Sequence, residues 1–244
     1  MPGALLLPLL VIHIGSGLIA LLSGLGAMAS PKSGSGLHPW SGNAFCLSMS
    51  VMTVTAAVLT AWEPDRLSLG AAIWTFYLVH SARGAARDRT ATRGPGSRWL
   101  IPVGISASVL FLHGGLVAQA SPAGEYQGTS PAAYFVFGTV AVLASLSDLS
   151  LLVRRHLAPR QRIARHLWRM VVAYFLAVTS LFLGQQDDVF PGMAGSPFLL
   201  LPSIFTLCYL AFWTLRVRLT RNWLAPLSLR RPSSESTRSK EDPA

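Results

Sequence analysis

Charged residues are scarce in this chain of 244 residues. Only 10 are acidic and 20 are basic, together 12% of the chain, whereas 51% are hydrophobic. Ordinary soluble domains carry about twice that share of charge. The scarcity therefore excludes a soluble globular protein and indicates an integral membrane protein.

Cysteine is almost absent. Cys46 and Cys208 both lie in apolar segments and lack the C-x-x-C or C-x-x-H spacing of a metal site, so neither a disulfide framework nor a zinc site is predicted. The sequence also has no phosphate-binding loop, no H-E-x-x-H motif and no paired catalytic carboxylates. Hydrolase chemistry of the kind found in soluble enzymes therefore has no support; any catalytic residues stay unidentified, and whether the protein is an enzyme stays open.

The net charge of +10 lies in short connectors between apolar runs. No soluble basic face with stacking aromatic residues accompanies it, so nucleic acid is not a predicted partner. Membrane lipids are the predicted partners, whereas a small-molecule or redox partner stays unidentified. The basic connectors have two interpretations: they fix the topology, which is favoured, or they also hold anionic lipid headgroups.

The first apolar run extends from Leu5 to Ala29 without a charged residue. At about 1.5 Å per residue, a helix of this length spans a hydrocarbon core of about 30 Å. A signal peptide is the competing interpretation, because Ala27-Met28-Ala29 resembles a cleavage site. The run lacks a basic segment before it and exceeds the roughly 7–15 residues of a signal-peptide core, so a membrane-spanning helix is favoured.

The remaining apolar runs predict an all-α polytopic transmembrane bundle of seven spans. The spanning domain covers 1–219, and the polar, Pro/Ser-rich segment 220–244 is predicted to be a largely disordered cytoplasmic tail. The predicted spans are 5–29, 40–62, 67–82, 99–120, 132–153, 166–184 and 198–215.

The connectors alternate in charge along the chain, and this alternation predicts the orientation. Acidic residues, with Arg66 as the single basic residue, occupy the even connectors. By the positive-inside rule, the N-terminus lies outside and the C-terminus inside a bacterial cytoplasmic membrane. The basic residues of the odd connectors and the C-terminal segment are Lys32, Arg83, Arg87, Arg89, Arg93, Arg98, Arg154, Arg155, Arg160, Arg162, Arg165, Arg216, Arg218, Arg221, Arg230 and Arg231.

Small residues recur at every fourth position of the first run, at Ser16, Ala20 and Gly24. This spacing places them on one helix face, where a second helix or a flat cofactor can approach the backbone closely.

Two motifs occur together in about the first sixty residues. The first run contains H-I-x-x-G-x-x-A-L-x-x-G from His13 to Gly24, and a Gly-rich connector leads to H-x-x-x-G from His38 to Gly42. This combination resembles a family of bacterial polytopic "predicted membrane proteins" that is known as a domain of unknown function. The likeness extends to Trp168-Arg169-Met170. The resemblance implies a multi-helix membrane fold and no activity.

Histidines at membrane depth carry the most specific functional hypothesis. His13 and His113 both fall in the outer half of the membrane, on antiparallel spans, and two imidazoles at matching depth can ligate b-type haem. Gly17, Gly114 and Gly115 would give the porphyrin room against the backbone. The sequence therefore predicts a haem b site at His13 and His113.

A second haem is predicted in the inner half, where His80 would act with either His38 or His166 as the ligands of the iron. Two stacked haems would carry electrons across the membrane. Each histidine also has a purely structural interpretation as a hydrogen-bonded residue, and His156 among the arginines is assigned only to topology.

Asp148 is the one acidic residue within a predicted span, near its inner end. A carboxylate in hydrocarbon needs a partner, and Arg154, Arg165 and Arg169 are within reach. A structural ion pair is favoured over a proton relay.

The alternative to haem is a bundle that binds or moves a small polar ligand in a cavity between the first, fourth and fifth spans, lined by His13, His113 and Asp148. A third alternative is a structural or assembly role without chemistry.

Overall fold

The computed structural model describes residues 3–31, 36–62, 65–87, 98–153 and 158–219. Within them the chain is helical and contains no β-strand, which confirms the all-α class. The long helices are α1 (Gly3–Ala29), α2 (Leu37–Leu59), α3 (Arg66–Arg87), α4 (Leu100–Ala120), α5 (Pro131–Val153), α6 (Pro159–Thr179) and α8 (Leu201–Leu219). Short elements between α6 and α8 are η2 (Ser180–Gly184), α7 (Gln186–Val189), η3 (Pro191–Met193) and η4 (Pro197–Leu200).

Several sequence predictions fall outside the described residues. They concern the predicted tail 220–244 and the connector residues Lys32, Arg89, Arg93, Arg154, Arg155, His156, Arg221, Arg230 and Arg231.

In the part of the chain that the structure describes, six helical segments are long and apolar enough to cross a membrane: those that contain α1, α2, α4, α5, α6 and α8. The protein therefore has the character of a multi-pass membrane protein. The helix α3 is similar in length but falls short of this apolarity, because Arg66, His80, Arg83 and Arg87 lie on it. Its length of 22 residues corresponds to about 33 Å.

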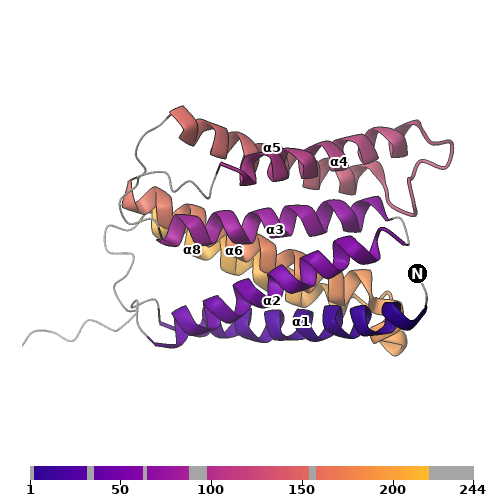
Figure 1. The fold of residues 1–244 in the computed structure, drawn as a ribbon, viewed down its shortest axis with the longest axis horizontal. Helices are drawn as coiled ribbons and strands as arrows, with labels where there is room; N and C mark the ends of the chain where they lie inside the picture. Colours follow the sequence, from indigo (N-terminus) through magenta and orange to yellow (C-terminus); the bar gives the residue numbers. More distant parts are fainter. Residues whose placement is uncertain (1–2, 32–35, 63–64, 88–97, 154–157, 220–244) are drawn as a thin grey trace, which may run out of the picture.

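The long helices run side by side along the longest axis of the molecule (Figure 1). In packing order, α1 lies against α2, α2 against α3, α3 against both α4 and α6, α4 against α5, and α6 against α8. The α4–α5 pair forms one edge of the bundle, and α1 lies at the opposite edge (Figure 1). Consequently α3 is the central helix.

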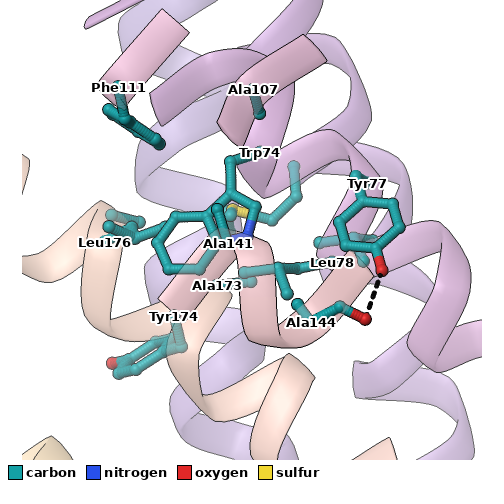
Figure 2. Packing of buried hydrophobic residues seen from close by; sticks show 14 of the residues in the cluster. Trp74, Tyr77, Leu78, Ala107, Phe111, Ala141, Ala144, Ala173, Tyr174 and Leu176 are labelled. Carbon is teal, nitrogen blue, oxygen red and sulfur yellow. Dashed lines mark hydrogen bonds between the residues drawn. The ribbon is translucent and has the colours of Figure 1, made fainter. Parts of the chain in front are cut away.

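Aromatic side chains of α3 fill the centre of the bundle. Trp74 is 1% exposed and packs edge-to-face on Phe111 of α4, with 5.9 Å between the ring centroids. Phe137 of α5 packs beside both rings. Figure 2 shows Trp74 and Tyr77 of α3 pointing between the neighbouring helices. The low hydropathy of α3 is thus compatible with its place, because its large apolar side chains face other helices.

The small-residue face of α1 is a helix-packing face. Ala20 is completely buried, and Ser16 and Gly24 are buried as well. A β-carbon at Gly24 would lie 2.5 Å from the ring of Tyr174 on α6, so this glycine lets α6 approach α1. The predicted close approach of a second helix is therefore observed.

Most predicted spans agree with the helices within a few residues, but the sixth begins much earlier. It was predicted from residue 166, whereas α6 begins at Pro159. Proline is well suited to the first turn of a helix, and the Gln161 side chain accepts a hydrogen bond from the Ala158 N–H at 3.2 Å. A prediction based on apolar runs missed these first two turns of α6, because they contain the charged residues Arg160, Arg162 and Arg165. The second span was predicted to end at residue 62, whereas α2 ends at Leu59.

Candidate functional site

A buried ionic cluster joins α3, α5 and α6. The Asp148 carboxylate, on α5, pairs with the guanidinium groups of Arg165 and Arg169, which lie one turn apart on α6. The Nη2 of Arg169 donates to Asp148 Oδ1 at 2.5 Å and its Nη1 donates to Oδ2 at 3.1 Å. Asp148 is 6% exposed and Arg169 is fully buried. The predicted ion pair of Asp148 is therefore confirmed for both arginines, whereas Arg154 lies outside the described residues.

Tyr77 completes the cluster from α3. Its hydroxyl lies 2.7 Å from Asp148 Oδ2 and 3.0 Å from the carbonyl oxygen of Ala144, both on α5 (Figure 2 shows the second contact). The Arg169 guanidinium lies 5.2 Å from the centroid of the Tyr77 ring and also donates to the Ala144 carbonyl at 3.1 Å. Three helices thus meet at one carboxylate.

The charges within this cluster do not balance. Two guanidinium groups face one carboxylate, and the salt bridges among the described residues provide no second acid. The Nε of Arg169 also has no hydrogen-bond partner among the described residues. A buried excess of positive charge is costly, and an anion nearby would lower that cost.

A cleft of about 490 Å³ lies beside the cluster, between α5, α6 and α8. It is at the basic end of the bundle, which we define as the end where α3, α5 and α8 finish and α6 begins. Three arginines line it, and none of its described lining residues is acidic. Its lining residues are Ser147, Ser150, Leu151, Arg160, Gln161, Ala164, Arg165, Trp168, Val217 and Arg218.

Arg165 belongs to both the cluster and the cleft. Its Nη2 pairs with Asp148, and its Nη1 donates to the hydroxyl oxygen of Ser147 at 3.2 Å. The side chain of Arg165 is 11% exposed, whereas that of Arg169 is completely buried. Of the two guanidinium groups in the cluster, a charged group in the cleft would therefore meet that of Arg165.

The predicted haem ligand His13 is hydrogen-bonded to a neighbouring helix. Its Nδ1 lies 3.1 Å from the Met52 carbonyl oxygen and 3.1 Å from the Thr55 hydroxyl oxygen, both on α2. The Met52 sulfur also occupies the space beside Gly17, at 3.4 Å from the position of an added β-carbon. This histidine thus ties α1 to α2.

The inner histidines also bond neighbouring helices. The Nδ1 of His38 lies 2.9 Å from the Ala27 carbonyl of α1, and that of His166 lies 3.1 Å from the Ala82 carbonyl of α3. The Nε2 of His80 lies 3.0 Å from the hydroxyl of Ser50 on α2. These contacts agree with the structural interpretation of the histidines.

His113 is exposed on α4, at the opposite edge of the bundle from α1 (Figure 1). The structure therefore does not bring it together with His13. Rings from α5 fill the space predicted for a porphyrin: Tyr134 lies 2.6 Å from a β-carbon built on Gly114, and Phe135 lies 2.7 Å from one built on Gly115. The haem hypothesis gains no support from this arrangement and stays a prediction from the sequence alone.

The alternative cavity between the first, fourth and fifth spans is also not assembled, because α1 packs against α2 and α6 while α4 packs against α3 and α5. Of its three predicted lining residues, only Asp148 belongs to the cluster. The described residues contain no group of three or more His, Cys, Asp or Glu side chains arranged to hold a metal ion.

Comparison of the chain with models of protein families, with curated proteins and with solved structures finds no match.

Sequence reasoning missed Tyr77 and the cleft. The basic residues that include Arg160 and Arg218 were interpreted as topology signals, with binding of anionic lipid headgroups as the less favoured alternative, and Ser147 and Trp168 received no role at the site. One signal was present: Arg160, Ala164, Arg165 and Trp168 recur at helical spacing, so a helix that begins at Pro159 would have placed them on one side.

Proposed function

We propose that this protein is a seven-span membrane protein of a bacterial cytoplasmic membrane that binds an anionic ligand in the cleft between α5, α6 and α8. One observation carries the proposal: among the described residues, three arginines and no acidic residue line the cleft, next to a cluster with two guanidinium groups and one carboxylate. The N-terminus lies outside and the C-terminus inside.

The central place of α3 supports the seventh span. A polar helix is costly where it faces lipid, but α3 packs between α2, α4 and α6 and buries nine of its residues, including Trp74, Tyr77 and Leu78. If α3 crosses, all basic connectors share one side, as the positive-inside rule requires. If α3 did not cross, Lys32 would lie on the opposite side from Arg83 and Arg98, and the acidic residue Asp65 would share the side of these two arginines.

Reporter fusions test this topology. A fusion to the C-terminus and one in the connector 88–97 should both report the cytoplasm, and one at Gly124, between α4 and α5, should report the periplasm. A further fusion at residues 63–64, before α3, should report the periplasm. A six-span protein with α3 on the surface would instead place residues 63–64 and the connector 88–97 on the same side, and that result would refute the seven-span arrangement.

The chemistry of the cleft supports an anion rather than a cation or an apolar molecule. Guanidinium groups bind phosphate, sulfate and carboxylate groups through paired charge-assisted hydrogen bonds. The hydroxyl of Ser147 and the first turn of α6 add donors and positive helix-dipole charge at the same place. A cationic ligand would meet three like charges there.

Anion binding is measurable on the delipidated protein in a neutral detergent. We expect inorganic phosphate, pyrophosphate or an anionic lipid to raise the midpoint of thermal unfolding, at constant ionic strength, and a zwitterionic lipid to leave it unchanged. The double variant Arg160→Gln/Arg218→Gln should weaken the apparent affinity at least about tenfold, since each arginine near the membrane surface contributes about 1 kcal/mol. No stabilisation by any anion, or equal stabilisation of the variant, would refute the proposed function.

A further inference from the structure

The cleft combines a basic wall with an apolar one. Arg160, Arg165 and Arg218 supply the charge, whereas Leu151, Val217 and part of Trp168 supply apolar surface. Val217 is buried against neighbouring residues, and Arg218 beside it is exposed. A small hydrated anion gains nothing from contact with the apolar wall, whereas an amphipathic molecule can bury apolar surface against it.

Apolar side chains continue outside the cleft, in the direction of the membrane interior. On α5, Leu146 is 53% exposed and Leu143, one turn deeper, is 61% exposed. On α8, Leu215 is 56% exposed and Phe212, again about one turn deeper, is 50% exposed. The two helices that flank the cleft thus present apolar surface below a basic site.

The backbones of α5 and α6 are linked mainly through long side chains at this end. The helix α5 packs closely on α4, whereas Arg165 and Arg169 of α6 reach across to Asp148 and Ala144. The space between these helices is where the cleft lies. An opening between membrane-spanning helices admits a ligand from within the bilayer.

We propose that the occupant of this cleft is the phosphate group of an anionic membrane phospholipid, with its acyl chains along the exposed faces of α5 and α8. This inference rests on the proposed function and specifies its ligand. The phosphate oxygens accept hydrogen bonds from the guanidinium groups of Arg165 and Arg218, and the phosphate charge offsets the excess positive charge beside Asp148. The Trp168 indole lies at the level of the headgroup, where tryptophan is favoured.

The test is a titration of the full-length, delipidated protein, monitored by native mass spectrometry, with phosphatidylglycerol and with phosphatidylcholine. Arg218→Gln is the test variant, because this exposed side chain forms no ion pair with any described residue. Arg87→Gln is the matched control: it removes another exposed arginine at the basic end, on α3, outside the cleft. Both variants leave the buried cluster intact and should fold.

We expect one phosphatidylglycerol to bind preferentially, with an affinity about fivefold lower in Arg218→Gln and unchanged in Arg87→Gln. Equal affinities in the two variants would show a non-specific lipid shell and overturn the inference. Saturation by inorganic phosphate without preferential binding of phosphatidylglycerol would also overturn it, while the proposed anion site would stand. Binding of neither anion would refute both proposals.

Discussion

Replacing Asp148 with asparagine is expected to destabilise the bundle by about 3–5 kcal/mol, the cost of leaving a buried charge without its partner. The substitution keeps the size of the side chain and an oxygen for the Tyr77 hydroxyl, but it leaves Arg165 and Arg169 facing each other without a carboxylate. The free energy of unfolding, measured by titrating detergent-purified protein with sodium dodecyl sulfate, reports this change. Asp187→Asn, on an exposed residue at the opposite end, is the matched control and should stay within about 0.5 kcal/mol of wild type.

The contrast with Arg165→Gln makes this prediction sharper. That variant leaves Asp148 with Arg169 as a balanced pair, so it should cost about 1 kcal/mol or less. If Arg165→Gln were as damaging as Asp148→Asn, Arg165 would be committed to Asp148 and could not serve the cleft. If Asp148→Asn behaved like the Asp187 control, the cluster would not hold α5 to α6 at all.

The ion pair itself was predictable from the sequence, because an unpaired carboxylate is costly within the hydrocarbon core and needs a cationic partner. Asp148 needs a cation, and Arg165 and Arg169 are spaced by one helical turn in the next segment, so both reach the same point. Tyr77 was not predictable in this way. A tyrosine in an apolar run has the same pattern whether its hydroxyl bonds a carboxylate or faces water, and only the packing of α3 against α5 and α6 distinguishes the two.

The histidines show the opposite limit. Depth along a helix can be estimated from the rise per residue, and His13 and His113 do have similar predicted depths. Depth says nothing about which helices are neighbours, however, and α1 and α4 lie at opposite edges of the bundle (Figure 1). Helix order within a bundle depends on the sum of many side-chain contacts. The estimated depths therefore identified histidines within the membrane but not the helices that these histidines contact.

The apolar runs predicted the helices well and their polar ends poorly. The first span was predicted as 5–29 and α1 covers Gly3–Ala29, since uninterrupted hydrophobicity marks both limits. The first two turns of α6 were missed, because an arginine-rich segment has the same composition whether it forms the polar end of a helix or a connector. Arg160 and Arg165 of the candidate site lie in that missed segment, and for this reason sequence analysis treated Arg160 chiefly as a topology signal and recognised Arg165 only as a partner of Asp148.

Replacing Gly24 with alanine is expected to destabilise the bundle by about 1–3 kcal/mol, as overpacking of a filled interior does. The added methyl group would lie 2.5 Å and 2.6 Å from two ring carbons of Tyr174 and 3.1 Å from the ring of Phe45. Neither ring has room to move away freely, because Tyr174 is 8% exposed and Phe45 is 4% exposed. The same unfolding titration measures the loss.

Gly15→Ala on the same helix is the matched control for Gly24→Ala. Apart from the adjacent residues and the backbone of α1 itself, no atom of the described residues lies within 4 Å of its added methyl group, so α1 should be unchanged or slightly more stable, by up to about 1 kcal/mol. In a background with Tyr174→Ala, the cost of Gly24→Ala should shrink, because the ring that it meets is gone; the difference is the coupling energy of the two positions. If Gly24→Ala and Gly15→Ala proved equally harmless, α6 would not approach α1 through this glycine, and the role of the small-residue face in helix packing would have to be abandoned.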